Sequence, residues 1–103
     1  MARVNYAQGV RKEIDDAIDY YEDARVGLGL EFLVEIEKAV EKLAMSPLRY
    51  RPVRSIFRRC LVNRFPYAII FSHEIRTDHI NIVAVMHMSR KPDYWLQRSK
   101  GGE

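Results

Sequence analysis

The chain has 103 residues, 48% hydrophobic and 11% aromatic, which is enough for one domain with a modest core and excludes a disordered chain. No run approaches the roughly 20 apolar residues of a membrane helix, and the N-terminus has no apolar signal-peptide core, so we expect a cytosolic protein without a membrane partner. Cys60 is the only cysteine and the three histidines lack metal-ligand spacing, so we expect no disulfide, no metal and no cofactor.

The net charge of +3 hides a division between two halves of the chain. Residues 13–45 hold ten acidic residues against three basic ones, whereas residues 46–103 hold eleven basic residues, nine of them arginine, against four acidic ones. The planar guanidinium of arginine suits paired contacts with phosphate or carboxylate. The basic half therefore indicates nucleic acid or an acidic protein as partner, and the alternative is a solvated face that only keeps the protein soluble.

A short strand and two helices are predicted in the first half. Residues 4–6 could form an edge strand. Apolar residues then recur at spacings of three and four from about Gln8 to Ala24 and again from about Leu28 to Met45, the pattern of one helix face. Gly27 can adopt the left-handed conformation that ends helices, and Pro47 stops the second helix. Two helices joined by a tight turn form an antiparallel hairpin.

The second half reads as strands after an arginine-rich connection, residues 48–55. The run YAIIF, residues 67–71, is apolar on both faces, which is typical of a central strand, and Pro66 stands at its start. A turn at 76–78 leads into a second strand over 79–88. Strict alternation would place one set of its side chains on one face (Ile80, Ile82, Ala84 and Met86) and another set on the other face (Val83, Val85 and His87).

These elements predict an α+β domain spanning 1–103. An N-terminal antiparallel helical hairpin packs on one face of a small, mostly antiparallel β-sheet, and a short C-terminal helix or extended segment follows. The opposite face of the sheet, with the segment after His87, is then free for function.

Four residues of the basic half have the side chains that metal-free RNA cleavage needs, namely a proton-exchanging group and cations for the charge on phosphorus. They are Arg64, His87, Arg90 and Tyr94. A histidine at a strand end is equally consistent with a structural hydrogen bond, and Tyr94 and Trp95 with an apolar cover over the sheet. Few acidic residues lie in this half, so a carboxylate base is poorly supplied.

Three runs in order resemble the toxins of the ParE/RelE superfamily, the toxic partners of type II toxin-antitoxin modules. They are YYEDARVGLGLEFLVEIEKAVEKLAMSP, RRCLVNRFPYAIIF and IVAVMHMSRKPDYWLQR, and the likeness extends from about Tyr6 to Arg98. The resemblance implies a helical hairpin on an antiparallel sheet. It also implies a hetero-oligomer with a cognate ParD-like or RelB-like antitoxin, whose acidic and apolar tail could use the groove between hairpin and sheet.

The superfamily divides by activity. RelE-like members cut messenger RNA on the ribosome, and the resemblance would give catalytic roles to Arg64, His87, Arg90 and Tyr94. ParE-like members poison DNA gyrase without catalytic residues of their own. We favour the ParE-like branch, because no lysine lies between Lys42 and Lys91, a carboxylate base is not evident, and the two helices are long, about 17 residues each by periodicity.

Three functions follow as hypotheses: a gyrase inhibitor, a ribosome-dependent mRNA endonuclease, or a basic module that only binds nucleic acid. Under any of them, the cations and aromatics of the basic half are the predicted partner-binding residues. If the mixed run FRRCLVNRF, residues 57–65, is a strand, neighbouring Arg58 and Arg59 point to opposite faces, so at most one joins a given site. The predicted set is Arg58, Arg59, Arg64, Arg90, Tyr94, Trp95 and Arg98.

Overall fold

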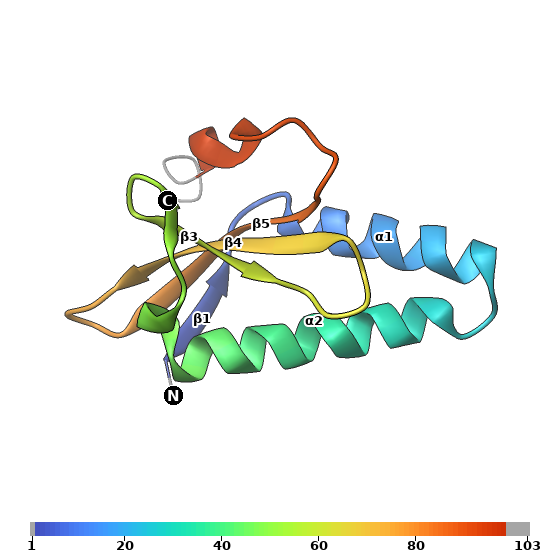
Figure 1. Ribbon diagram of the computed structural model, residues 1–103, viewed down its shortest axis with the longest axis horizontal. Coiled ribbons are helices and arrows are strands. Elements are labelled where there is room, and N and C mark those ends of the chain that lie inside the picture. Colours follow the sequence, from blue (N-terminus) through green and yellow to red (C-terminus); the bar gives the residue numbers. More distant parts are fainter. Residues whose placement is uncertain (1, 99–103) are drawn as a thin grey trace.

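The computed structural model describes residues 2–98, which form an α+β fold as predicted. In chain order the elements are β1 (Arg3–Tyr6), α1 (Val10–Ala24), α2 (Leu28–Met45), η1 (Pro47–Arg49), β2 (Pro52–Arg54), β3 (Phe57–Leu61), β4 (Tyr67–Glu74), β5 (His79–His87) and η2 (Tyr94–Gln97). The strands form one sheet in the order β1-β5-β4-β3-β2, antiparallel except for the parallel pair β1 and β5. The α1–α2 hairpin lies on one face of the sheet and the C-terminal segment on the other (Figure 1).

The helical hairpin α1–α2 confirms the two helices predicted from the apolar spacing in the first half. The α2 stripe is buried against the sheet (Phe32, Ile36, Ala39 and Leu43), and burial of each of its three larger side chains, Phe32, Ile36 and Leu43, contributes about 2 kcal/mol. The backbone of Gly27 is left-handed, with φ of 90°. Gly27 does not end α1, however, but is the N-cap residue of α2. Glu22 of α1 accepts hydrogen bonds from the Gly27 and Gly29 N–H groups, at 3.0 Å each, and so caps the N-terminus of α2.

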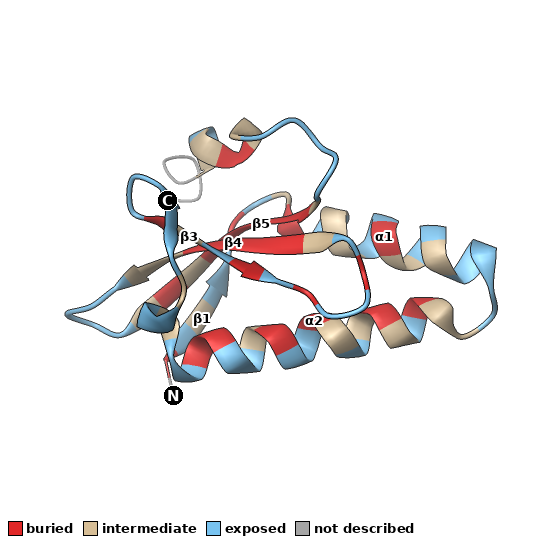
Figure 2. Ribbon diagram, in the orientation of Figure 1, coloured by how far each residue is buried: buried red, intermediate tan, exposed pale blue. Residues whose placement is uncertain are grey.

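The predicted strands 67–71 and 79–88 are β4 and β5, and β4 is the middle strand of the sheet. Figure 2 shows that burial is concentrated in β4 and β5 and on the side of α2 that faces the sheet, whereas the edge strands β1 and β2 are mostly exposed. An aromatic cluster joins the hairpin to the sheet. The centre of the Phe32 ring lies 5.0 Å from that of Tyr67 and 5.2 Å from that of Phe65. None of the helices in residues 2–98 is long and apolar enough to span a bilayer.

The predicted division of β5 between two faces is wrong. Ile70 pairs with Ala84 and Phe71 with Ile82, so Val83 is an extra residue, a β-bulge that shifts the alternation by one. As a result, the helix-facing set is Ile80, Ile82, Val85 and His87, whereas Ala84 and Met86 lie on the other face. Alternation alone cannot reveal a bulge inside a continuous apolar run.

The arginine-rich connection contains two elements that its composition did not predict. The 3-10 helix η1 follows α2, and β2 pairs with β3 through a register shift between Pro52 and Arg54. Because β2 has only three residues, it covers only the beginning of β3.

Candidate functional site

Glu13 of α1 is the centre of a polar cluster that joins α1, β5 and the C-terminal segment. Its carboxylate accepts hydrogen bonds from the Val85 N–H at 3.0 Å and from the Tyr94 hydroxyl. It also pairs with Arg98 at 3.0 Å and Arg90 at 3.4 Å. The Glu13 side chain is only 9% exposed, so its charge is satisfied almost entirely by these partners.

The backbone of β5 explains why this cluster forms where it does. β1 pairs with β5 from His79 to Ile82, and the Ala7 N–H donates to the Ile82 carbonyl at 2.8 Å before the chain turns into α1. Beyond that point no strand within residues 2–98 lies beside this edge of β5. Arg98 donates to the Val83 carbonyl at 3.2 Å, and Glu13 accepts from Val85, so two side chains replace the missing strand.

The electrostatics of the cluster favour a neutral Tyr94. Burial raises the pKa of Tyr94, the hydrogen bond to Glu13 raises it further, and the cations Arg90 and Arg98 oppose the shift. Both guanidinium groups lie over the Tyr94 ring, at 3.7 Å and 5.1 Å from its centre. Tyr94 therefore acts as a hydrogen-bond donor to Glu13, and its ring is in contact with two cations.

His87 lies beside this cluster. A surface depression of about 270 Å³ is lined by Glu13, Asp16, Ala17, Tyr20, Tyr67, Val85, His87 and Arg90. The His87 Nδ1 accepts the Ser89 N–H at 3.0 Å, and its ring meets the Tyr67 ring edge-on at 5.3 Å. Because Nδ1 is the acceptor, a neutral His87 carries its proton on Nε2.

Arg64 does not join the other three predicted residues. It has a left-handed backbone, with φ of 71°, and its guanidinium reaches back to α2, pairing with Glu31 at 2.6 Å and Glu35 at 3.9 Å. The hydrogen bond from Arg64, assisted by Arg25, lowers the pKa of Glu31. The structure thus brings together His87, Arg90 and Tyr94 and places Arg64 with the acids of the hairpin.

The remaining predicted partner residues are divided between the two faces of the sheet. Arg58 points toward the hairpin and donates to the Tyr50 carbonyl at 2.5 Å, whereas Arg59 lies on the opposite face, as strand geometry requires. Trp95 is 2% exposed, and the centre of its ring lies 5.0 Å from that of the Phe57 ring. This confirms the apolar cover for Trp95. The Tyr94 hydroxyl turns instead toward α1.

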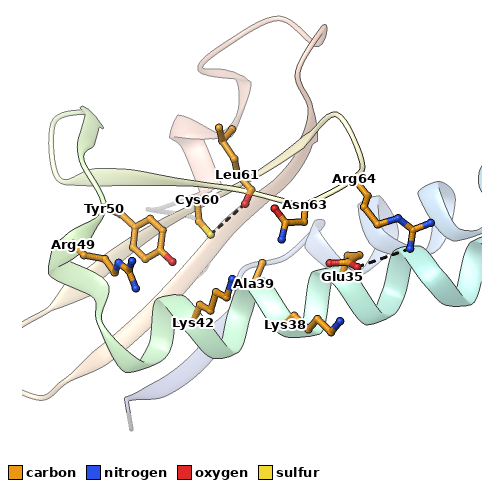
Figure 3. A pocket seen from close by; sticks show the side chains of 10 residues that line it. All are labelled: Glu35, Lys38, Ala39, Lys42, Arg49, Tyr50, Cys60, Leu61, Asn63 and Arg64. Atoms are coloured by element: carbon orange, nitrogen blue, oxygen red, sulfur yellow. Dashed lines mark hydrogen bonds and ion pairs between the residues drawn. The ribbon is translucent and has the colours of Figure 1, made fainter.

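A basic groove of about 620 Å³ lies between α2 and β3 (Figure 3). It is lined by Glu35, Lys38, Ala39, Lys42, Arg49, Tyr50, Cys60, Leu61, Asn63 and Arg64. Within residues 2–98, Lys38, Lys42 and Arg49 take part in no ion pair, although Arg49 lies 5.9 Å from the Tyr50 ring centre. Burial raises the pKa of the Cys60 thiol beneath these cations. The groove presents unpaired positive charge to a ligand.

Glu13 is the residue that sequence reasoning missed, since the candidate groups were all taken from the basic half of the chain. Glu13 is 72 residues from Val85 and 81 from Tyr94 in the chain, so no local pattern links them. The only available signal was its position one turn before Ala17, beside the apolar stripe. It supplies the carboxylate that the basic half lacks, but this carboxylate is already paired with Arg90 and Arg98.

Comparisons with known proteins place the chain in a family. Residues 4–92 match the family described as the ParE toxin of the type II toxin-antitoxin system, parDE. The fold is similar to a solved chain of the "Chromosomal ParDE TA system from P. aeruginosa", with a TM-score of 0.74 and 15% identity over 86% of this chain and 98% of that one. No curated protein matches the sequence. Because the family match covers most of its length, the chain belongs to the ParE toxin family of type II toxin-antitoxin systems.

Proposed function

We propose that this protein is a toxin that inhibits DNA gyrase and stalls the enzyme with its DNA cleaved. The family match over residues 4–92 is the observation that carries the proposal. The toxin would act as a protein inhibitor, without catalytic residues of its own, in the cytoplasm where gyrase works.

The arrangement of the arginines supports a non-catalytic role. Cations that stabilise a reacting phosphate must be free to meet it. Here Arg90 and Arg98 share the Glu13 carboxylate, and Arg64 is bound to Glu31. A nucleic-acid substrate would have to displace these carboxylates first.

We also propose that a cognate antitoxin neutralises the toxin by binding its basic surface. The solved relative is described as a ParDE toxin-antitoxin system. The groove between α2 and β3 would meet an acidic partner with Lys38, Lys42 and Arg49.

An expression experiment separates gyrase inhibition from mRNA cleavage. The chain is induced in cells that carry a DNA-damage reporter, while incorporation of labelled amino acid measures translation. Gyrase poisoning predicts induction of the reporter before translation falls. An immediate stop in translation without reporter induction would contradict the proposal.

The alternative is a ribosome-dependent mRNA endonuclease, favoured by one observation: His87 and Arg90 line a single depression beside Glu13. In this case primer extension on translated messages would show new 5′ ends that vanish in His87→Ala and Arg90→Ala. Unchanged transcripts would exclude the nuclease. A third possibility, simple nucleic-acid binding, predicts affinity that falls steeply with salt and no toxicity.

A further inference from the structure

The outer edge of β1 is open. β1 is an edge strand of the sheet, with β5 as its neighbour (Figure 1). The Arg3 and Ala7 N–H groups both donate to carbonyls of residues 78–82, at 3.1 Å and 2.8 Å. Because successive residues of a strand direct their backbone groups to alternate sides, the N–H and C=O groups of Val4 and Tyr6 point away from β5. No strand within residues 2–98 lies on that side, so these groups are available for pairing.

The side chains of the same two residues lie beside an apolar pocket. Val4 and Tyr6 are on the helix side of the sheet, because they pair with Ile80 and Ile82. Tyr6 is 53% exposed, and neither residue carries the charge that commonly protects a sheet edge from pairing. Tyr6 lines a pocket of about 350 Å³ between α1 and α2, together with apolar side chains of both helices, among them Ile14, Ile18, Leu33 and Val40. A strand added beside β1 would therefore need apolar side chains on its helix side.

The charges around this pocket favour neither an acidic nor a basic partner. The charged residues of its lining are Arg11, Asp15 and Glu37, and Arg11 pairs with Asp15 at 3.6 Å. The groove between α2 and β3 differs, because its unpaired cations favour an acidic ligand. A strand that fits β1 is thus apolar on the helix side and needs no net charge.

A second copy of β1 meets these requirements. Antiparallel pairing about a two-fold axis at Asn5 places Val4 of each copy opposite Tyr6 of the other, so that all their outward N–H and C=O groups are hydrogen-bonded. On the face away from the helices, the two Asn5 amides meet. Arg3 of each copy lies opposite Ala7 of the other, which keeps the two Arg3 residues about 14 Å apart. No like charges face each other across this ladder.

We propose that two copies of the chain associate through their β1 strands, antiparallel and centred on Asn5, so that two five-stranded sheets become one continuous sheet. The exposed Tyr6 side chain of each copy then packs against Val4 of the other, at the mouth of the pocket between α1 and α2. β1 is at the opposite edge of the sheet from β3 and β2, so this association leaves the groove between α2 and β3 open.

Sedimentation velocity of the purified chain over a range of micromolar concentrations tests the association. A concentration-dependent dimer is expected, and a monomer at every concentration would overturn the proposal. Asn5→Asp and Asn5→Lys should each weaken dimerisation at least about tenfold, because each places two like charges directly opposite one another. Asn63→Asp is the matched control, since Asn63 is exposed between β3 and β4, away from this edge. Equal dimerisation of the Asn5 and Asn63 variants would also overturn the proposal.

An equimolar mixture of Asn5→Asp and Asn5→Lys keeps the test independent of any folding defect in either variant. The carboxylate of one chain then lies opposite the ammonium group of the other. The mixture is expected to form a heterodimer at concentrations where each variant alone is monomeric. A mixture that stays monomeric would contradict pairing at Asn5.

Disulfide cross-linking tests the register. The two Asn5 residues form a non-hydrogen-bonded pair with Cα atoms about 4.5 Å apart, which is within disulfide range, so Asn5→Cys is expected to give a covalent dimer on mild oxidation. Arg3→Cys is the control on the same face, where the two residues are too far apart to be linked. The native Cys60 is buried and should not contribute. Equal yields of covalent dimer from the two variants would rule out the register. These experiments involve neither gyrase nor toxicity, so their outcome is independent of the proposed function.

Discussion

Glu13 shows how one carboxylate can hold three parts of a chain together. It joins the first turn of α1 to the free backbone of β5 and to the segment that ends at Arg98. Most surface ion pairs contribute little to stability because water competes with them. Glu13 differs, because its side chain is 9% exposed and accepts a backbone N–H in addition to the cations.

Glu13→Ala is expected to destabilise the protein by about 3 kcal/mol, because it leaves the Val85 N–H without its acceptor and removes the carboxylate that pairs with Arg98. Asp16→Ala is the matched control on the exposed face of α1, where Asp16 forms a surface ion pair with Lys12, and its expected cost is below about 0.5 kcal/mol. Urea denaturation followed by circular dichroism measures both. Equal unfolding midpoints of the two variants would contradict the role of Glu13.

Tyr94 gives the cluster a pH dependence. Because its folded-state pKa is raised above the ordinary 10.0, its neutral hydroxyl stabilises the fold below about pH 10, and this contribution is lost as pH rises through the folded pKa. Tyr94→Phe should therefore be less stable than wild type by about 1 kcal/mol at neutral pH, with the difference shrinking in alkali. Urea titrations at neutral and alkaline pH measure it, with Tyr20→Phe as an exposed control. A constant difference across this range would be inconsistent with the Tyr94–Glu13 hydrogen bond.

Only part of the candidate site could be predicted from the sequence. His87, Arg90 and Tyr94 are close in the chain, so their proximity follows from local spacing. Arg64 was wrongly placed with them, since its left-handed backbone turns it toward Glu31 on α2. The chain gives no local signal for that conformation at an arginine. Whether the predicted residues contact a partner stays a prediction.

The α1–α2 hairpin depends on a close approach at Gly29. A Cβ added there would lie 2.7 Å from the Ile18 carbonyl oxygen, a backbone atom that cannot move without shifting α1. Gly29→Ala is therefore expected to cost about 2 kcal/mol through overpacking. At Gly27 a Cβ would meet nothing within 4 Å, but φ is +90°, so Gly27→Ala should cost about 1 kcal/mol through backbone strain alone.

Thermal unfolding of both variants tests this distinction. The sequence predicts a special backbone conformation for Gly27, in the turn between the helices. It gives no indication that Gly29 differs from other positions of the second helix. If Gly29→Ala were as stable as wild type, the helices would not approach as closely as described.

The elements with strong periodicity were predicted; among those without it, the edge strand expected at residues 4–6 is present as β1, whereas others were missed. Apolar spacing gave α1, α2, β4 and β5 to within a few residues. It missed β2, which has three exposed residues, and it missed the bulge at Val83, whose effect is a change of face inside a run that is apolar throughout. In both cases the partner strand decides the structure, and a single strand's sequence does not contain that information.

At the scale of the whole molecule, the acidic and basic halves partly neutralise each other. Arg90 and Arg98 meet Glu13, and Arg64 meets Glu31, so three of the arginines predicted to face a partner also join the C-terminal half to the hairpin. Three cations of the groove, Lys38, Lys42 and Arg49, form no ion pair within the described part of the chain, and two of them belong to the acidic half by sequence. Charge counted along the chain therefore predicted a basic surface but not its location.

The measurement that tests the account most directly is a gyrase assay with the purified chain, relaxed plasmid and ATP. Reactions without toxin and without gyrase are the controls. After detergent and protease treatment, the account predicts linear plasmid that increases with toxin concentration, because the inhibitor stalls gyrase with its DNA cleaved. Normal supercoiling in excess toxin, with no linear product, would contradict it.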